Sequence, residues 1–457
     1  MGDHNIQSAS NDKARQRFIH NLLDDIEALE LMLKEDKIEK GIVRIGAEQE
    51  FCIVDKNWRP NTNSQSVLKT INDPHFTTEL AKYNLEINLD PFELKQDALS
   101  RLEAQLRSLL QKAEEATAKE NSEIILTGIL PSITTHEIGL GFMTEHSRYY
   151  ALNDVLKKLR GNDFRLHLSG VDELSMGHDS VMFEACNTSF QMHLQIDPDD
   201  FISSYNWAQA ISGPVLGLCV NSPILLGREL WQETRVAVFQ QSIDTRDISY
   251  ALKDQQSRVT FGERWASGTV ADLYKNEISR FRIILTKEIK ESSLDQLSQG
   301  KIPKLEALSL HNGTIYRWNR PCYGVGDGKA HLRIENRYIP AGPTIIDEMA
   351  NFAFWAGLMV GRPKEFDNIR KTMDFKDAKS NFIKAARYGS ESIMMWMGEE
   401  IPVKDLVLNK LLPIAYSGLR KMKIHENDIN RYLQIIENRV QRFTPAHWMI
   451  RNYRALK

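Results

Sequence analysis

The sequence has 457 residues, enough for one large domain or two, and a formal net charge of −3 at pH 7. This near-balanced charge, with no basic stripe, argues against nucleic-acid binding. The N-terminus lacks the apolar region of a signal peptide, and no run approaches ~18 apolar residues, so no membrane-spanning helix is expected. The four cysteines are scattered without CxxC spacing. They are expected to be buried, reduced thiols in a cytoplasmic protein.

Hydrophobic periodicity predicts a series of helices and strands. In chain order these are a helix over residues 12–36, a β-rich segment to about residue 95, a helix over 97–119, a strand over 123–129, a helix over 144–159, a strand over 183–196, and helices over 206–220 and 344–360. Thr344 is the expected N-cap of the last of these helices, with Asp347 as its capping-box partner. From about residue 375 the chain is predicted to be helical to its end.

Strands in this order do not alternate regularly with helices. That arrangement favours an α+β fold with a mainly antiparallel sheet over a doubly wound one. The sequence contains no repeats or long linkers. We therefore predict a catalytic domain over residues 1–370, with a helical subdomain over 371–457 packed on it.

Two glutamates stand two residues apart within an apolar run rich in β-forming residues, Ile45 to Val54. Alternate residues of a strand point to one face, so Glu48 and Glu50 are expected to share a face. Bare carboxylates on a mostly apolar strand are costly unless a cation compensates them. Surface strands also carry glutamates, so this strand alone leaves a metal site and a solvated face as alternatives.

A second strand, His331 to Tyr338, places Arg333, Glu335 and Arg337 on one face. A carboxylate between two arginines suits a site that holds a metal and an anion together. Mg²⁺ prefers oxygen ligands from carboxylates, water and substrate phosphates. The two strands together therefore point to ATP–Mg²⁺ chemistry.

A third strand carries Glu86, Asn88 and Asp90 on one face, and Glu93 lies just beyond Pro91. Alternation alone does not decide what this polar face contacts. A solvated strand face remains a serious competitor to a metal site, above all for Glu86.

A fourth strand alternates polar and apolar residues, with Gln191, His193 and Gln195 on one face. A lone strand histidine is more often structural than a ligand. Two glutamines beside it, opposite an apolar face, nevertheless suit the wall of a polar cleft.

The glycine-rich segment from Tyr323 to Ala330 is not a phosphate-binding P-loop. It lacks the GxxxxGK[ST] spacing, and it precedes a strand where a P-loop follows one and opens a helix. A flexible turn is the expected structure, although Lys329 could still reach a nucleotide phosphate as a point charge. No nucleophile elbow, zinc spacing or dinucleotide fingerprint is found, which disfavours hydrolase, zinc-enzyme and dinucleotide functions.

With these segments assembled, the chain resembles the second, plant-and-bacterial type of the glutamate–cysteine ligase family, which includes bacterial carboxylate–amine ligases. The matching segments are Gly46 to Phe51, Asn221-Ser222-Pro223 with Gly227-Arg228 and Arg235, Gln191 to Asp197, and Arg333 to Arg337. They occur in the expected order, and the resemblance spans roughly residues 40 to 360. Gln49 stands at a position that is often charged in the family.

The resemblance implies a glutamine-synthetase-like architecture, in which a curved, mainly antiparallel sheet flanked by helices forms a funnel with metals and ATP at its floor. By this resemblance the Mg²⁺ ligands would be Glu48, Glu50, Glu86, Glu93, His193 and Glu335. Arg337 would bind the phosphoryl group during transfer, beside Glu335. The carboxylate substrate would meet Arg228 or Arg235, with Asn221, and the nucleotide would meet Lys329 and Gln191.

The leading hypothesis is an ATP-dependent carboxylate–amine ligase of glutathione biosynthesis that uses Mg²⁺, with glutamate and cysteine or another amine as substrates. Its amide product would form through an acyl phosphate. One alternative is a phosphotransferase acting on a guanidino or carboxylate metabolite. Another is a catalytically silent nucleotide-binding regulator whose helical tail contacts a partner. The expected partners are small amino-acid substrates, with no nucleic acid or membrane, and a homodimer is the default expectation.

Overall fold

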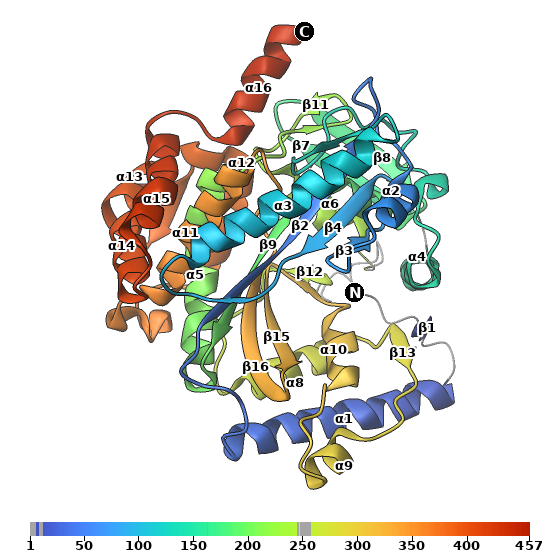
Figure 1. Ribbon diagram of the computed structural model, residues 1–457, viewed down its shortest axis with the longest axis vertical. Coiled ribbons are helices and arrows are strands. Elements are labelled where there is room, and N and C mark those ends of the chain that lie inside the picture. The colour runs from blue at the N-terminus through green and yellow to red at the C-terminus, as the bar shows by residue number, and fades with distance from the viewer. Residues whose placement is uncertain (1–5, 9–11, 162, 245, 247–256) are drawn as a thin grey trace.

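The computed structural model describes residues 6–8, 12–161, 163–244, 246 and 257–457, and its central element is a curved eight-stranded sheet (Figure 1). Its strands run in the order β15 (Asn319–Gly326), β16 (Lys329–Asn336), β9 (Phe190–Ile196), β2 (Arg44–Val54), β4 (Asn84–Asn88) and β3 (Phe76–Thr78). Two short strands, β5 (Phe92–Glu93) and β6 (Glu123–Ile125), also pair with β2. Every pairing between these strands is antiparallel, which confirms the predicted α+β fold class.

One face of this sheet is apolar and is covered by helices (Figure 1). The covering helices include α3 (Ala98–Ala118), α5 (Phe201–Cys219) and α11 (Ile345–Val360). Phe190 of β9 packs edge-to-face on Phe352 of α11, with 6.4 Å between ring centroids. The residue composition of α11 is apolar around most of its circumference, so this helix is buried almost throughout. Thr344 caps it by accepting a hydrogen bond from the backbone N–H of Asp347, as predicted.

The first helix, α1 (Asp12–Lys34), lies away from the sheet beside three other helices (Figure 1). These are α8 (Val270–Arg280), α9 (Ser293–Ser298) and α10 (Glu306–Asn312). Asp25 of α1 is buried and accepts hydrogen bonds from Ser293 and from the backbone N–H of Leu308. These contacts fix the N-terminal helix to the segment that leads into β15.

The C-terminal region packs on α5 and α11. It consists of α12 (Phe375–Tyr388), the hairpin β17 (Ile393–Trp396) and β18 (Glu399–Pro402), α13 (Val403–Leu406), a π-helical turn (Val407–Leu411), α14 (Leu412–Lys421), α15 (Glu426–Gln441) and α16 (Pro445–Leu456). The prediction of helix from residue 375 to the end is wrong at this hairpin, where Met397 and Gly398 have positive φ and turn the chain between the strands. The predicted boundary at residue 370 stays a prediction.

The remaining elements are short or lie outside the central sheet. They are α2 (Ser64–Ile71), α4 (Ser147–Arg160), α6 (Thr234–Ser242), and the strand pairs β1 (Ile6–Ser8) with β13 (Leu285–Lys287), β7 (Phe164–Ser169) with β8 (Glu173–His178), β10 (Ile224–Leu225) with β11 (Arg228–Glu229), and β12 (Val259–Thr260) with β14 (Tyr316–Arg317). All four cysteines are buried free thiols, as predicted. Among the described residues, no helix is both long enough and apolar enough to cross a membrane.

Three predicted elements differ from the structure. The strand expected over 183–196 begins as a 3-10 helix, Val181–Cys186, because Ser180 caps a helical turn by accepting from Met182 N–H. The strand expected over 123–129 ends at Ile125, since the backbone N–H of Gly128 donates to Asn221 O instead of to a neighbouring strand. The glycine-rich segment is a β-hairpin whose turn, Asp327-Gly328, has positive φ at both residues and suits a type I′ geometry.

Candidate functional site

The other face of the sheet is polar across five neighbouring strands. It presents Arg44, Glu48 and Glu50 of β2, Glu86 and Asn88 of β4, Gln191, His193 and Gln195 of β9, Arg333 and Glu335 of β16, and Arg320 of β15. Strand register aligns these residues: His193 lies opposite both Gly46 and Glu335, and Glu50 lies opposite Glu86. The alternation predicted from the sequence therefore holds, and it brings four segments distant in the chain to one surface.

Glu335 is the centre of what we call the arginine-compensated cluster, made of Glu335, Arg320, Arg337, His193 and Glu48. Arg320 donates from Nε and Nη2 to Glu335 Oε2 at 3.0 and 2.6 Å, and Arg337 donates to Glu335 Oε1 at 2.5 Å. His193 Nε2 lies 3.2 Å from Glu48 Oε1, while its Nδ1 lies 3.9 Å from Glu335 Oε2. The imidazole thus lies between two carboxylates, within hydrogen-bond distance of Glu48 only.

The protein supplies the positive charge in this cluster. Burial by itself would raise the pKa of Glu335, but Arg320 and Arg337 outweigh burial and hold the pKa well below its usual range. Glu48 behaves alike: burial opposes ionisation, yet the contact with His193 lowers its pKa. Both carboxylates are therefore ionised at neutral pH.

A second group, which we call the carboxylate cluster, consists of Glu50, Glu79 and Glu86. Their oxygens lie within 4.8 Å of one another. Glu50 accepts from Ser189 N–H at 2.7 Å and from Gln191 Nε2 at 3.0 Å, and Asn88 donates to Glu86 at 2.9 Å. These donors are neutral, and none of the three carboxylates forms an ion pair with a described residue.

The carboxylate cluster is electrostatically strained. Burial, together with Glu48 and Glu50, raises the pKa of Glu86 to about 8. Burial and the charge of Glu86 raise the pKa of Glu79 well above its usual range. Burial also raises the pKa of Glu184 to about 7, with Glu50 adding to the shift. Three converging carboxylates that repel one another are the oxygen-rich donor set that suits a hard divalent cation.

Glu79 and Glu184 were missed by the sequence reasoning. Glu79 follows β3 in irregular backbone, and Glu184 lies in the 3-10 helix before β9, so neither belongs to an alternating strand. Arg320 was missed too, although it directly faces Glu335 across the β15–β16 ladder. No periodic signal in the sequence marks any of the three.

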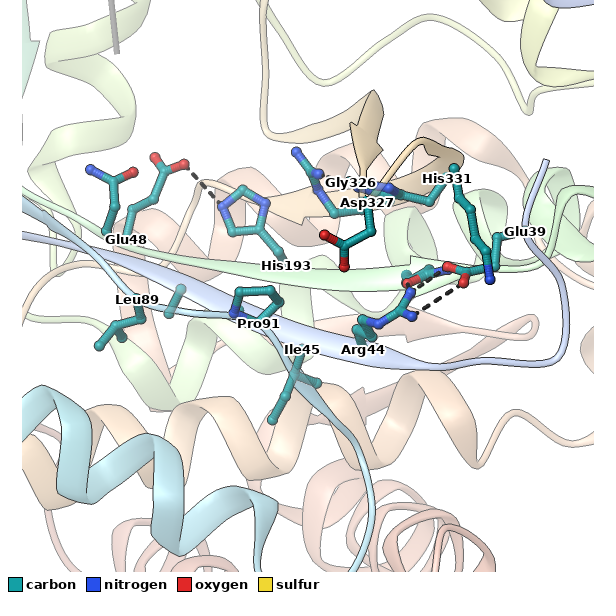
Figure 2. Close-up of a pocket in the computed structure, with 16 residues that line it drawn as sticks. Glu39, Arg44, Ile45, Glu48, Leu89, Pro91, His193, Gly326, Asp327 and His331 are labelled. Atoms are coloured by element: carbon teal, nitrogen blue, oxygen red, sulfur yellow. Dashed lines mark hydrogen bonds and ion pairs between the residues drawn. The ribbon is translucent and has the colours of Figure 1, made fainter. Parts of the chain in front are cut away.

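A cavity of about 340 Å³ opens beside the arginine-compensated cluster (Figure 2). Glu48 and His193 lie at one end, and Arg44, which pairs with Glu39, lies at the other. Gly46 stands between them, and a Cβ there would meet nothing within 4 Å. The glycine of the acidic strand thus leaves the floor of the cavity open. Lys329 also lines the cavity, and its predicted role at a nucleotide phosphate stays a prediction.

The other predicted site residues differ in where they lie. Arg235 is buried and pairs with Glu233 at 3.0 Å. Burial raises the pKa of Glu50 and of Glu184, and the charge of Arg235 offsets part of each rise, so Arg235 lies near the carboxylate cluster. Arg228 is exposed on the separate β10–β11 hairpin.

Asn221 is buried, with its side chain donating to Ala341 O at 2.8 Å. Glu93 is exposed on β5 and pairs with Lys95 at 2.5 Å.

Residues 44–455 match the sequence family described as glutamate–cysteine ligase family 2, and the chain belongs to that family. Family membership makes the protein an ATP-dependent ligase. Among solved structures, it is similar to a glutamate–cysteine ligase from Francisella tularensis in complex with AMP, with 13% identity and a TM-score of 0.51 over 91% of this chain and 85% of that one. This likeness confirms the predicted fold.

A bifunctional glutathione synthetase from Pasteurella multocida also matches, with 13% identity and a TM-score of 0.49, over 94% of this chain and 50% of that one. A comparison with curated proteins finds no match.

Proposed function

We propose that this ligase joins the γ-carboxylate of glutamate to the amine of cysteine or of a related amine, using ATP and Mg²⁺. The observation that carries the proposal is the juxtaposition of two clusters on one sheet face. One is a carboxylate cluster suited to a cation, and the other is an arginine-compensated cluster suited to an anion. An ATP-dependent ligation needs both, because a metal-bound polyphosphate and a carboxylate must meet in one place.

The proposed reaction has two steps. A carboxylate oxygen attacks the γ-phosphorus of ATP, and the bond between that phosphorus and the oxygen bridging to the β-phosphate breaks. The products of this step are an acyl phosphate and ADP. The amine nitrogen then attacks the acyl carbon, the C–O bond to phosphate breaks, and an amide and inorganic phosphate form after the nitrogen loses a proton. Phosphoryl transfer needs little covalent help from the protein; it needs alignment and neutralisation of oxygen charge.

Specific residues suit these needs. Glu50, Glu79 and Glu86 would hold one Mg²⁺ ion without nucleotide. Glu48, His193 and Glu335, where two arginines already balance the charge, would hold a second only together with ATP phosphates. Bound Mg²⁺ would supply neutralisation of phosphate oxygens. We assign Arg337, which Glu335 orients, to the phosphoryl group in transfer. Arg235 is the better candidate of the two predicted arginines for the substrate carboxylate, since it is buried beside Glu50 whereas Arg228 is exposed. Glu93 and Asn221 have no contact that favours their predicted roles.

The test is ADP release with Mg-ATP and glutamate, with and without a panel of amines headed by cysteine. Amine-dependent ADP release, with an amide found by mass spectrometry, supports the proposal and identifies the acceptor. Release of ADP without any amine, together with a phosphorylated metabolite, would instead favour a phosphotransferase. Binding of ATP with no release under any amine would overturn the glutamate–amine assignment.

A further inference from the structure

We propose that Arg333 binds the non-transferred phosphates of the nucleotide, and that His331 and Gly324 act as positioning residues for its guanidinium group. This inference rests on the proposed use of ATP, and it adds a phosphate-binding residue to that site. It also gives a purpose to the glycine-rich hairpin, which the absence of a P-loop pattern left unexplained.

The position of Arg333 is the first argument. Its Cα pairs with those of Gln195 and Cys322 in the ladders on either side, and it shares the polar face with Glu335 two residues further along β16. It lines the same cavity as Glu48 and His193. A nucleotide whose γ-phosphate lies at the two clusters would place its other phosphates along this cavity.

The charge of Arg333 is the second argument. Most cations around it are already neutralised: Arg44 pairs with Glu39, and Arg320 pairs with Glu335. Across the described part of the chain, neither Arg333 nor Lys329 forms an ion pair with a carboxylate. The Nε atom of Arg333 is buried without a hydrogen-bond partner. A buried guanidinium N–H without an acceptor is costly unless a ligand such as an anion binds it.

His331 holds this arginine without cancelling its charge. Arg333 Nη1 lies 2.7 Å from His331 Nε2, which accepts the hydrogen bond. Burial, followed by the charge of Arg333, lowers the pKa of His331 to about 4, so the imidazole is neutral at physiological pH. A neutral acceptor fixes the orientation of the guanidinium and leaves its positive charge available.

Gly324 makes room for this pair. A Cβ at Gly324 would lie 2.7 Å from His331 Nε2 and 2.8 Å from Arg333 Nη1, closer than van der Waals contact allows. Gly324 lies opposite His331 on β15. Its missing side chain is therefore a steric requirement of the Arg333–His331 contact. Planar guanidinium groups match phosphate oxygens in charge and geometry, which favours a polyphosphate as the anion.

The experiment compares the binding of Mg-ADP and of adenosine to the full-length protein by calorimetry, because neither ligand can react. We expect Arg333→Gln to weaken Mg-ADP binding by at least about tenfold and to leave adenosine binding unchanged. Arg333→Lys should recover part of the loss. Arg451→Gln, on the exposed terminal helix α16, is the matched control and should bind both ligands as the wild type does.

An unchanged Mg-ADP affinity in Arg333→Gln, or an equal loss for adenosine, would overturn the inference. A wild-type protein that binds no nucleotide would overturn both this inference and the proposed function. Normal Mg-ADP binding that depends on Arg333, without amide formation in the ligase assay, would uphold the inference and contradict the proposed function alone.

The positioning residues need a kinetic readout. For Gly324→Ala and His331→Phe we expect a higher KM for ATP, while the KM for glutamate stays at the wild-type value. His331→Gln retains a side-chain acceptor and should be milder than His331→Phe. A uniform fall in kcat with an unchanged KM for ATP would show that these residues are merely structural and would refute their assigned role.

Discussion

The two clusters on the polar face contain the same kind of residue and differ in how their charge is balanced. In the arginine-compensated cluster, two guanidinium groups contact Glu335 and hold its pKa below the usual range. In the carboxylate cluster, neutral donors contact Glu50 and Glu86, and the pKa of Glu86 rises to about 8. Arginines of the protein balance the negative charge of the first cluster. The second cluster depends on a cation from solution for its charge balance.

This difference separates two roles within a single surface. A carboxylate already paired with two arginines is held in a fixed geometry and can orient Arg337 toward an anion. In the carboxylate cluster, burial and neighbouring charges raise the pKa of Glu79 and of Glu86, so ionising them costs free energy that a bound divalent cation would offset. Substitutions in the two clusters should therefore have opposite effects on stability.

The largest effect is expected for Glu335→Gln. Its loss removes the group that orients Arg337 and leaves two partly buried arginines without their buried partner, so turnover should fall about 10²–10³-fold. The protein should also lose about 3 kcal/mol or more of stability, as when one partner of a buried ion pair is removed. Steady-state ADP release and urea unfolding measure the two effects. Wild-type turnover in this variant would show that Glu335 is not part of the active site.

Glu79→Gln should act in the opposite sense on the apo protein. Removing one of three repelling carboxylates should raise the metal-free melting temperature by about 2 °C. The same change should weaken Mg²⁺ binding at least about tenfold, because a charged ligand is lost. Melting curves with and without Mg²⁺ show both. A lower melting temperature in metal-free buffer would contradict the charge repulsion inferred here.

Stability of the metal-free protein should depend on pH through two buried glutamates. The pKa of Glu86 and that of Glu348 both rise from 4.5 to about 8 on folding, chiefly through burial. The folded state therefore binds more protons, so stability is full below pH 4.5 and falls as pH rises toward 8. Each group should contribute a loss of about 1 kcal/mol per pH unit in this window.

The two glutamates can be told apart with Mg²⁺. Glu86 belongs to the carboxylate cluster, whereas Glu348 lies on α11 and accepts from Gly342 N–H at 2.6 Å. Saturating Mg²⁺ should remove the contribution of Glu86 and leave that of Glu348. Urea unfolding of Glu86→Gln and of Glu348→Gln measures how much each glutamate contributes to the pH dependence of stability. The measurements run between pH 5 and 8, values that bracket the window to about one unit. A pH slope in Glu86→Gln equal to that of the wild type would count against this assignment.

The smallest effect is expected away from both clusters. Thr344→Ala removes the N-cap of α11 and should cost about 1 kcal/mol of stability. It should leave the affinity for Mg²⁺ unchanged, since α11 covers the opposite face of the sheet. A loss of Mg²⁺ affinity would show that the clusters are less independent of the supporting helix than the contacts indicate.

Alternation in the sequence predicted the strand faces well. Glu48, Glu50, His193 and Glu335 were predicted to line polar faces, and register brings them together as expected. The prediction of strand faces succeeds because the alternation of side chains is a property of the strand itself. Periodicity does not say which strands are neighbours, and the strand order is seen only in the structure.

Other features depend on tertiary structure. Glu79 has no periodic signal, because it follows a three-residue strand. Arg320 precedes Pro321, a residue that argues against a central strand, yet β15 is the terminal strand of the sheet and tolerates it. Arg228 and Arg235 lie only seven positions apart in the sequence, and the feature that distinguishes them is that Arg235 is buried whereas Arg228 is exposed. No local pattern contains that information.

The most direct test of the account is the binding of Mn²⁺, as a paramagnetic substitute for Mg²⁺, to the nucleotide-free protein by electron paramagnetic resonance. We expect a bound ion in the wild type and in Thr344→Ala, and loss of that ion when Glu50, Glu79 or Glu86 is changed to glutamine. Equal Mn²⁺ binding in the wild type and all three glutamine variants would contradict the claim that the carboxylate cluster is a cation site.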